Sequence, residues 1–374
     1  MKIILAPDKF KGSLTGLEFC DEVEGVLRSK LPHAEILRVP LADGGDGTIE
    51  VVNHYLKGKT IRTEVSNPFF QPIDASYLYS ESTKTAFIEM AEASGHKILS
   101  NDELDVKNAT TLGTGELIVD AMERGAETII LGVGGSATND CGIGMATALG
   151  YRFLDKNNNE VKPIGLNLSK IKSIDDSNLH PKMEHVSFKV ACDVSNPLYG
   201  KNGAAQVYAK QKGASSEDIV MLDKGLRDFS KVMDAHFKID SQNTKGAGAA
   251  GGMGIGAYTF LNTELTPGID LVKDIADFDN KIKGADWIIT GEGSLDEQTL
   301  SGKAVIGVLN TARNNKIPVA TFCGQVLLDD DALVGLGIAF SDSIMNHAKS
   351  FDDAILNTRS YLKKISEQFC EYLG

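Results

Sequence analysis

The sequence predicts an α/β protein of two domains, and three observations favour this class. First, five short apolar runs read as buried strands: 2–6, 35–39, 286–290, 318–323 and 337–340. Second, segments of helical periodicity alternate with these runs, as in parallel sheets that carry helices on both faces. Third, the chain has 374 residues, which is more than the roughly 250–300 residues at which single hydrophobic cores usually split.

The predicted elements follow in order at the two ends of the chain. Thr15 and Glu18 have the spacing of a capping box, and apolar side chains then recur at helical intervals until Pro32 ends the segment. A second helix is expected from Thr48 to a stop at Gly58. Two further helical patterns lie near the C-terminus, at 304–312 and 354–365.

The middle of the chain differs from both ends. It mixes short strands with helical patterns and a polar, lysine-rich stretch. Asn67-Pro68 is a turn signal at its start. We therefore predict an outer domain formed by residues 1–66 and 285–374, into which residues 67–284 are inserted as a mixed α/β domain.

Composition excludes several classes of protein. The net charge of −13 and the pI of about 5.1 argue against a surface for nucleic acid or an anionic membrane. The five cysteines are scattered and contain no C-x-x-C pair, which argues against a disulfide framework or a structural zinc site. No stretch approaches the ~18 consecutive apolar residues of a spanning helix. We expect a reduced, soluble, cytoplasmic protein that binds small molecules, as a monomer or a homodimer.

Polar or glycine-rich loops follow the predicted strands of the outer domain. Because open parallel sheets bind ligands beyond the carboxyl ends of their strands, we expect these loops to meet at one edge and form a site. Asp43 and Asp46 flank Gly44-Gly45 in the second loop, and such carboxylates suit magnesium, which takes one or two of them plus phosphate oxygens. Asp46 could equally be the N-cap of the helix that begins near Thr48.

Three further polar residues follow strands or begin helices. Asp296 lies in the glycine-rich loop after 286–290, and Asp193 follows a predicted strand, where an Asx turn accounts for it as well as a catalytic role does. Lys303 stands at a predicted helix start, where free amides attract anions. The spacing there is not that of a Walker A loop, so Lys303 could also be a solvated lysine.

Two glycine-rich stretches of the middle domain could approach phosphate groups. Gly132–Ala137 follows a strand and is a permissive match to a dinucleotide fingerprint, with Asp155 at the expected distance downstream. A second match, Gly246–Gly251, follows no predicted strand. It is either a flexible or closely packed loop, or a backbone nest that approaches a ligand.

Six segments, in this order, resemble the signature segments of the bacterial glycerate kinases, type-1 family: 6–14 (APDKFKGSL), 40–48 (PLADGGDGT), 134–140 (GGSATND), 192–198 (CDVSNPL), 248–254 (GAAGGMG) and 290–296 (TGEGSLD). The similarity covers essentially the whole chain, and one departure is Cys141, where the family pattern has glycine. The resemblance implies phosphorylation of glycerate by ATP with magnesium. It also implies a flavodoxin-like, three-layer parallel domain, an inserted domain, and an active-site cleft between them.

Phosphoryl transfer needs groups that hold phosphates, carboxylates for a metal, an anchor for the substrate carboxylate and an acceptor for the hydroxyl proton. The candidate catalytic residues are Asp296 as the first choice of base, Asp193 as the second, and Lys9. The candidate substrate-binding residues are Asp8, Lys11, Ser13 and Ser294. The candidate nucleotide- and phosphate-binding residues are Gly134, Gly135, Ser136, Thr138, Gly251, Gly252 and Lys303. The candidate metal ligands are Asp43 and Asp46.

The predicted function is therefore the ATP-dependent phosphorylation of D-glycerate to 2-phosphoglycerate or 3-phosphoglycerate in the breakdown of organic acids. Two alternatives remain open from the sequence. One is an NAD-dependent oxidoreductase that uses the Gly132–Ala137 loop. The other is a non-catalytic sensor of sugar acids.

Overall fold

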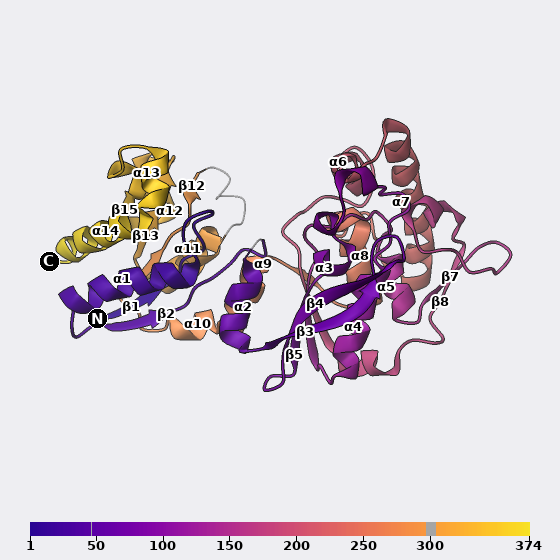
Figure 1. Cartoon of the computed structure of the whole chain (residues 1–374), viewed down its shortest axis with the longest axis horizontal. Coiled ribbons are helices and arrows are strands. Elements are labelled where there is room, and N and C mark those ends of the chain that lie inside the picture. Colours follow the sequence, from indigo (N-terminus) through magenta and orange to yellow (C-terminus); the bar gives the residue numbers. More distant parts are fainter. Residues whose placement is uncertain (46, 297–303) are drawn as a thin grey trace. The chain divides into compact units, whose positions relative to one another are not determined.

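The structure is a computed structural model that describes residues 1–45, 47–296 and 304–374. The predicted site residues Asp46 and Lys303 lie outside these described residues. The chain forms two compact units, residues 1–55 with 267–374 and residues 56–266. Both chain ends belong to the first unit, which includes the strands labelled β1 and β15 in Figure 1. The strands labelled β3 to β8 belong to the second unit.

A five-stranded parallel sheet organises the first unit, in the order β15-β13-β11-β1-β2. Its strands are β1 (Lys2–Leu5), β2 (Glu35–Arg38), β11 (Trp287–Thr290), β13 (Val319–Cys323) and β15 (Ile338–Ser343). Counted within the unit, this order is 2-1-3-4-5, which is the strand order of flavodoxin-like sheets. The α/β class and the five apolar runs are therefore confirmed for this unit.

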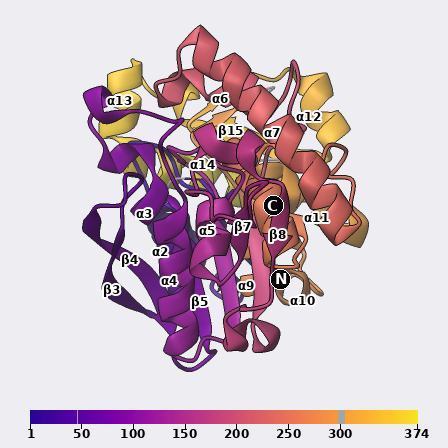
Figure 2. The same ribbon diagram turned by 90° about the vertical axis from the view of Figure 1, so that its right-hand side faces the viewer.

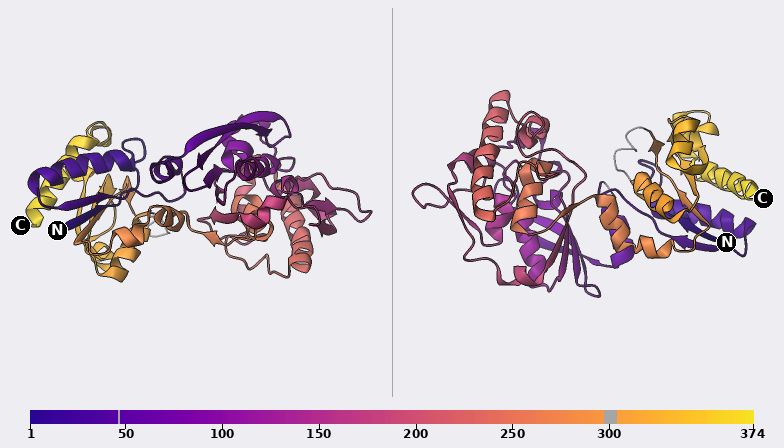
Figure 3. Two further views of the ribbon diagram at one scale, coloured as in Figure 1. Left: turned by 90° about the horizontal axis from the view of Figure 1, so that it is seen from below. Right: turned by 180° about the vertical axis from the view of Figure 1, so that it is seen from behind.

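Helices cover the sheet of the first unit. The helix α1 (Gly16–Lys30) starts at the capping box of Thr15 and Glu18, and it packs beside α14 (Thr358–Tyr372), as Figures 1 and 3 show. Aromatic side chains fill the core between these helices and the sheet: Phe19, Phe322 and Phe369. The remaining helices of the unit are α2 (Thr48–Leu56, which ends at the boundary), α9 (Gly268–Ile275), α10 (Phe278–Lys281), α11 (Ala304–Asn315), α12 (Asp330–Leu336) and α13 (Phe351–Leu356).

The second unit contains a six-stranded mixed sheet in the order β10-β9-β6-β5-β4-β3. Its strands are β3 (Lys59–Ser66), β4 (Pro72–Ser80), β5 (Thr85–Glu89), β6 (Thr128–Gly132), β9 (Ser187–Ala191) and β10 (Leu265–Thr266). The pairs β3–β4 and β4–β5 are antiparallel, whereas β5, β6, β9 and β10 pair in parallel. A separate pair, β7 (Arg152–Leu154) and β8 (Ser173–Asp175), is antiparallel.

The helices of the second unit surround this sheet. In Figure 2, α4 (Leu112–Glu123) crosses β3, β4 and β5, which it contacts. The other helices are α3 (Ala91–Ser94), α5 (Ile143–Ala148), α6 (Ala204–Tyr208), α7 (Ser216–Phe237) and α8 (Ala249–Phe260). Short 3₁₀ segments in the chain are η1 (His96–Ile98), η2 (Asn101–Glu103), η3 (Gly165–Lys170), η4 (Pro181–His185), η5 (Lys210–Lys212) and η7 (Ile344–Asn346). None of the described helices is long and apolar enough to cross a membrane.

The unit boundaries differ from the predicted domain boundaries at residues 66 and 285. Residues 59–66 form β3, which pairs with β4 along its whole length and therefore belongs to the second unit. This strand is polar and largely exposed, so it lacks the apolar run that predicts a strand. At the other boundary, α9 packs against α11, which places residues 268–275 in the first unit.

Candidate functional site

Three carboxylates gather at the carboxyl ends of neighbouring strands in the first unit. Asp8 lies in the loop after β1, Asp43 in the loop after β2, and Glu292 in the loop after β11. Burial, with the charges of Asp43 and then Glu292, raises the pKa of Asp8 to about 7. Asp8 and Asp43 are therefore brought together as the strand order predicts. Glu292 was not singled out from the sequence, although it stands in the resembling segment directly after a strand.

The surrounding loops place these groups by close backbone contacts. Gly45 donates its backbone N–H to Oδ1 of Asp43 over 2.9 Å. A Cβ atom on Gly268, at the start of α9, would lie 2.4 Å from the carbonyl oxygen of Asp43, so this approach requires glycine. A Cβ atom on Gly47 would lie 3.3 Å from Nζ of Lys9, which puts the Lys9 ammonium beside the loop after β2. The Lys9 ammonium thus shares this sheet edge with several carboxylates.

The donor set of this edge fits magnesium. Among the described residues, no group of three or more His, Cys, Asp or Glu side chains is arranged to hold a metal. Magnesium needs only one or two protein carboxylates when phosphate oxygens complete its shell. Burial, and after it the charges of Asp43 and Glu292, raise the pKa of Asp8, and a divalent cation there would lessen the repulsion among these carboxylates.

A small cavity of about 70 Å³ lies in the first unit beside these loops. Its polar lining comes from Lys11, Ser13, Gln325 and Thr358, and apolar side chains such as Phe10 and Met345 form the rest. The Ser13 hydroxyl donates to Oγ1 of Thr358 over 2.5 Å. The structure therefore brings the predicted substrate-binding residues Lys11 and Ser13 to one cavity.

A hydrogen-bonded chain connects that cavity to Asp296. Gln325, in the short strand β14 (Gln325–Val326), donates through Nε2 to Oγ of Ser294 over 3.1 Å. Ser294, in the paired strand β12 (Ser294–Leu295), donates in turn to Oδ2 of Asp296 over 3.1 Å. The predicted residues Ser294 and Asp296 are thus adjacent, and Gln325 is a third member that the sequence did not indicate.

In the second unit, the loop after β6 packs against the start of α8. Ala250, Gly251 and Gly252 have φ of 52°, 75° and 87°, so the chain turns left-handed before the regular part of α8. A Cβ atom on Gly251 would lie 2.1 Å from the carbonyl oxygen of Thr138, and Cys141 donates its N–H to the carbonyl of Gly251 over 3.1 Å. The segment that directly follows Gly132–Ala137 therefore contacts the second glycine-rich stretch at Gly251.

The predicted phosphate-binding residues of this loop divide by exposure. Gly134 and Gly135 are exposed, whereas Ser136 is 6% and Thr138 0% exposed. Because Ser136 and Thr138 are buried, they support the conformation of the loop. Gly134 and Gly135 are the residues of the loop that a ligand in solvent can reach. Asp193 follows β9, the neighbour of β6 in the sheet, and is exposed.

Lys212 is a buried residue of this region that sequence reasoning missed. It lies in η5, donates through Nζ to Oγ of Ser136 over 2.7 Å and donates to the carbonyl oxygen of Thr138 over 2.8 Å. Burial lowers the pKa of Lys212 to about 7. No local pattern around residue 212 marks it, because its partners lie 74 and 76 residues away in the sequence.

The dinucleotide fingerprint does not have its expected structural setting. In that fold, the acidic residue ends a strand that is parallel to the first. Here Asp155 follows β7, which pairs with β8 in a separate antiparallel sheet, and not with β6. Asp155 instead accepts backbone N–H groups from Asn157 and Asn159, as in a turn. The geometry gives the nicotinamide alternative no support from this residue.

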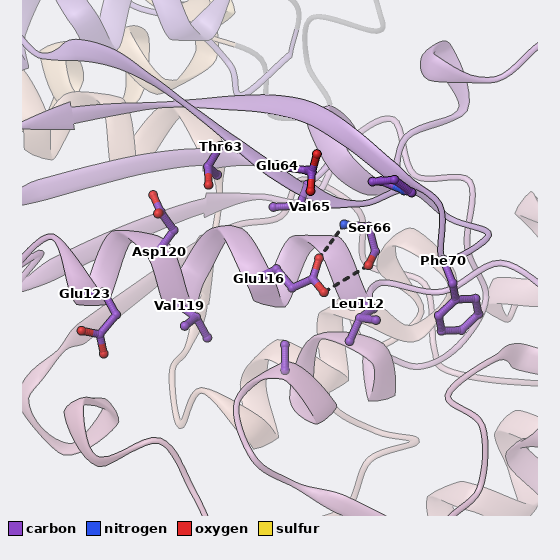
Figure 4. Close-up of a pocket in the computed structure, with 12 residues that line it drawn as sticks. Thr63, Glu64, Val65, Ser66, Phe70, Leu112, Glu116, Val119, Asp120 and Glu123 are labelled. Atoms are coloured by element: carbon purple, nitrogen blue, oxygen red, sulfur yellow. Dashed lines mark hydrogen bonds between the residues drawn. The ribbon is translucent and has the colours of Figure 1, made fainter.

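A larger groove, of about 700 Å³, lies between β3 and α4 in the second unit. Figure 4 shows that its polar lining is acidic, with Glu64, Glu116, Asp120 and Glu123 along its walls. Glu116 accepts hydrogen bonds from the backbone N–H and the hydroxyl of Ser66, at 2.5 and 3.1 Å. Four carboxylates disfavour phosphate groups, and none of the predicted site residues is among the described residues that line the groove.

Fold and site together define an α/β protein with polar strand-end loops that suit small anionic ligands. A model of the glycerate kinase family matches residues 3–374. The chain is 40% identical to the glycerate kinase of Bacillus subtilis (strain 168), over 97% of this chain and 95% of the relative. It is also 40% identical to glycerate 2-kinase of Escherichia coli (strain K12), over 95% and 93%.

A solved structure agrees with these relatives. A crystal structure described as a candidate glycerate kinase 2 from Salmonella typhimurium LT2 superposes with a TM-score of 0.88 at 38% identity, covering 100% of this chain and 98% of the other. The chain belongs to the glycerate kinase family. Family membership implies a phosphotransferase that acts on an alcohol group and uses a nucleotide.

Proposed function

We propose that this chain is an ATP-dependent glycerate kinase of the type-1 family, which phosphorylates D-glycerate to 2-phosphoglycerate or 3-phosphoglycerate in the cytoplasm. The observation that carries the proposal is the edge of the first unit's sheet. There, one parallel sheet presents the lysines Lys9 and Lys11 together with the carboxylates of Asp8, Asp43 and Glu292. Phosphoryl transfer depends mainly on positioning and on electrostatic stabilisation, and these groups can supply both.

Glycerate would bind at the cavity lined by Lys11 and Ser13. The cavity volume of about 70 Å³ suits a molecule of a few heavy atoms. The Lys11 ammonium would hold the carboxylate, and the Ser13 hydroxyl and the Gln325 amide would orient the hydroxyl groups. Asp8 would take part in substrate binding. Lys9 would face the transferring phosphoryl group.

Asp296 is the first candidate for the group that accepts the hydroxyl proton, and Asp193 is the second. The chain from Gln325 through Ser294 to Asp296 supports the first choice, because it holds the carboxylate in a fixed orientation. Alternatively, Asp193, in the loop after β9, would accept the hydroxyl proton.

The nucleotide phosphates would meet the backbone amides of the exposed Gly134 and Gly135, with Lys303 as a further cation. Gly251 and Gly252 are buried and would support this loop through their close packing on Thr138 and Cys141. Asp43 and Asp46 would hold magnesium, which neutralises the charge of the phosphates when bound. Glycine loops bind phosphate through amides without adding net positive charge, so an acidic chain can still bind ATP.

The test is a coupled assay of ADP release with ATP and magnesium, with and without D-glycerate. We expect ADP formation only when glycerate is present. Lys11→Gln should raise KM for glycerate at least tenfold and leave KM for ATP within about twofold. The exposed Lys364→Gln on α14 is the matched control.

Absence of glycerate-dependent ADP release from folded protein at saturating ATP would overturn the proposal. Binding of glycerate without turnover would favour a sensor, and stabilisation by NAD alone would favour an oxidoreductase.

A further inference from the structure

Lys212 is a charged side chain in the interior of the second unit. It is 3% exposed, and lysine is seldom buried to this extent without a partner. Two of its three ammonium N–H groups can be assigned, to Oγ of Ser136 and to the carbonyl oxygen of Thr138. Both acceptors belong to the loop between β6 and α5, which we call the phosphate loop (residues 133–140).

The charged groups around Lys212 come from the elements packed against it. Asp140, at the end of the phosphate loop, is fully buried and favours the charged form of Lys212. The Asp140 carboxylate is itself held by four donors, namely the backbone N–H and hydroxyl of Thr111 and the backbone N–H groups of Gly142 and Gly144. On the same segment as Lys212, Lys210 is exposed. On α6, Tyr208 donates its hydroxyl to Asn196.

Apart from the bonds of Asp140, few side-chain hydrogen bonds hold the described residues of the phosphate loop. Oγ1 of Thr138 and Nδ2 of Asn139 are buried and have no hydrogen-bond partner among the described residues. Lys212 therefore supplies the side-chain tie between η5 and the buried half of the loop. The exposed half, Gly134 and Gly135, directly precedes Ser136, which Lys212 holds. A second contact comes from His96, whose backbone N–H donates to the carbonyl oxygen of Gly135 over 3.0 Å.

We propose that Lys212 is the positioning residue of the phosphate loop, which it holds through Ser136 and Thr138 while placing a positive charge beneath the exposed glycines. The inference rests on the proposed function, in which this loop binds the nucleotide phosphates. A buried charge acts through a low effective dielectric, so the ammonium attracts phosphates without contacting them. Lys212 then affects the binding of nucleotide and not of glycerate.

A consequence is that nucleotide binding takes up a proton. The pKa of Lys212 is about 7 because of burial, so the side chain is largely neutral at pH 8. A bound polyphosphate favours the ammonium form and raises this pKa. At pH 8 the complex should therefore bind more protons than the separate partners do.

The experiment compares wild type with Lys212→Met, Lys212→Arg and the exposed control Lys210→Met. KM for ATP should rise at least tenfold in Lys212→Met, with KM for glycerate within about twofold, and the control should match wild type. KM for ATP should rise between pH 6.5 and 8.5 in wild type. It should change less over that range in Lys212→Arg, which stays charged and so retains part of the affinity.

Calorimetry of Mg-ADP binding at pH 8, in two buffers of different ionisation enthalpy, measures the proton directly and requires no turnover. Wild type should take up a proton and Lys212→Met should not. Unchanged KM for ATP in Lys212→Met, or equal proton uptake in the two proteins, would overturn the inference. If Lys212→Met does not fold, the comparison is between wild type and Lys212→Arg. Mg-ADP binding to wild type without proton uptake would overturn the inference, whereas proton uptake in wild type but not in Lys212→Arg would support it. Failure of the proposed function would appear separately, as wild type without glycerate-dependent turnover.

Discussion

Replacing Asp8 with Asn should stabilise the protein at alkaline pH. Burial and the charges of Asp43 and Glu292 raise the pKa of Asp8 from 3.8 to about 7. Because the folded state holds this proton more tightly than the unfolded chain does, ionisation of Asp8 opposes folding. The cost is absent well below pH 3.8, grows between pH 3.8 and about 7, and is complete above about 7.

The size of the effect follows from the pKa. At about 1.4 kcal/mol per pKa unit, the rise from 3.8 to about 7 corresponds to about 4 kcal/mol above pH 7. Asp8 keeps partial exposure to solvent, which screens part of this cost, so we take about 2 kcal/mol as the working figure. For a unit of this size, that gives an increase in Tm of about 4–8 °C.

The assay is thermal unfolding of wild type and Asp8→Asn, in chelator, at pH 5 and pH 8. An asparagine at this position can still accept the backbone N–H of Lys9, which lies 2.7 Å from Oδ1 of Asp8, so the comparison isolates the charge. The gain in Tm should be clearly larger at pH 8 than at pH 5. The exposed control Asp331→Asn on α12 should shift Tm little and equally at both values. A gain that is the same at both pH values, or a loss of Tm at pH 8, would refute the reasoning.

Two further predictions concern the loops of the site. Gly251→Ala should lower Tm by several degrees and raise KM for ATP, because its Cβ would lie 2.1 Å from the carbonyl of Thr138 at a φ of +75°. Gly134→Ala, where a Cβ meets nothing within 4 Å, is its control and should leave Tm within about a degree. Asp296→Asn should lower kcat by about 10²–10⁴ with an unchanged Tm, and Asp193→Asn tests the second candidate base in the same way. Near-normal kcat in both folded variants would show that neither is the base.

The central strands of the first unit, β1, β11 and β13, could be predicted because they are largely buried on both faces. Ile3, Ile4 and Leu5 are fully buried in β1, and a strand without an exposed face is a continuous apolar run. The strand β3 could not be predicted in this way. Its exposed edge position permits the polar sequence KTIRTEVS, and its pairing with β4 depends on contacts that no local pattern shows.

The candidate site divides along similar lines. The proximity of Asp8 and Asp43 could be predicted, because parallel strand order brings their loops to one edge. The burial of Lys212 could not be predicted, because it depends on contact with Ser136, which is distant in the sequence. Asp155 shows the opposite error. Its spacing fits a dinucleotide site, but β7 pairs in another sheet, so spacing alone could not establish the pairing.

The phosphorus NMR spectrum of a reaction of the purified protein with D-glycerate, ATP and magnesium shows directly whether phosphate is transferred to glycerate. We expect the γ-phosphate signal of ATP to decline while a phosphomonoester signal grows. Without proton decoupling, the multiplicity of this signal identifies the product. Phosphate on the C2 oxygen couples to one proton and gives a doublet, whereas phosphate on the C3 oxygen couples to two and gives a triplet. A spectrum in which ATP persists, or yields only inorganic phosphate, would contradict phosphoryl transfer to glycerate.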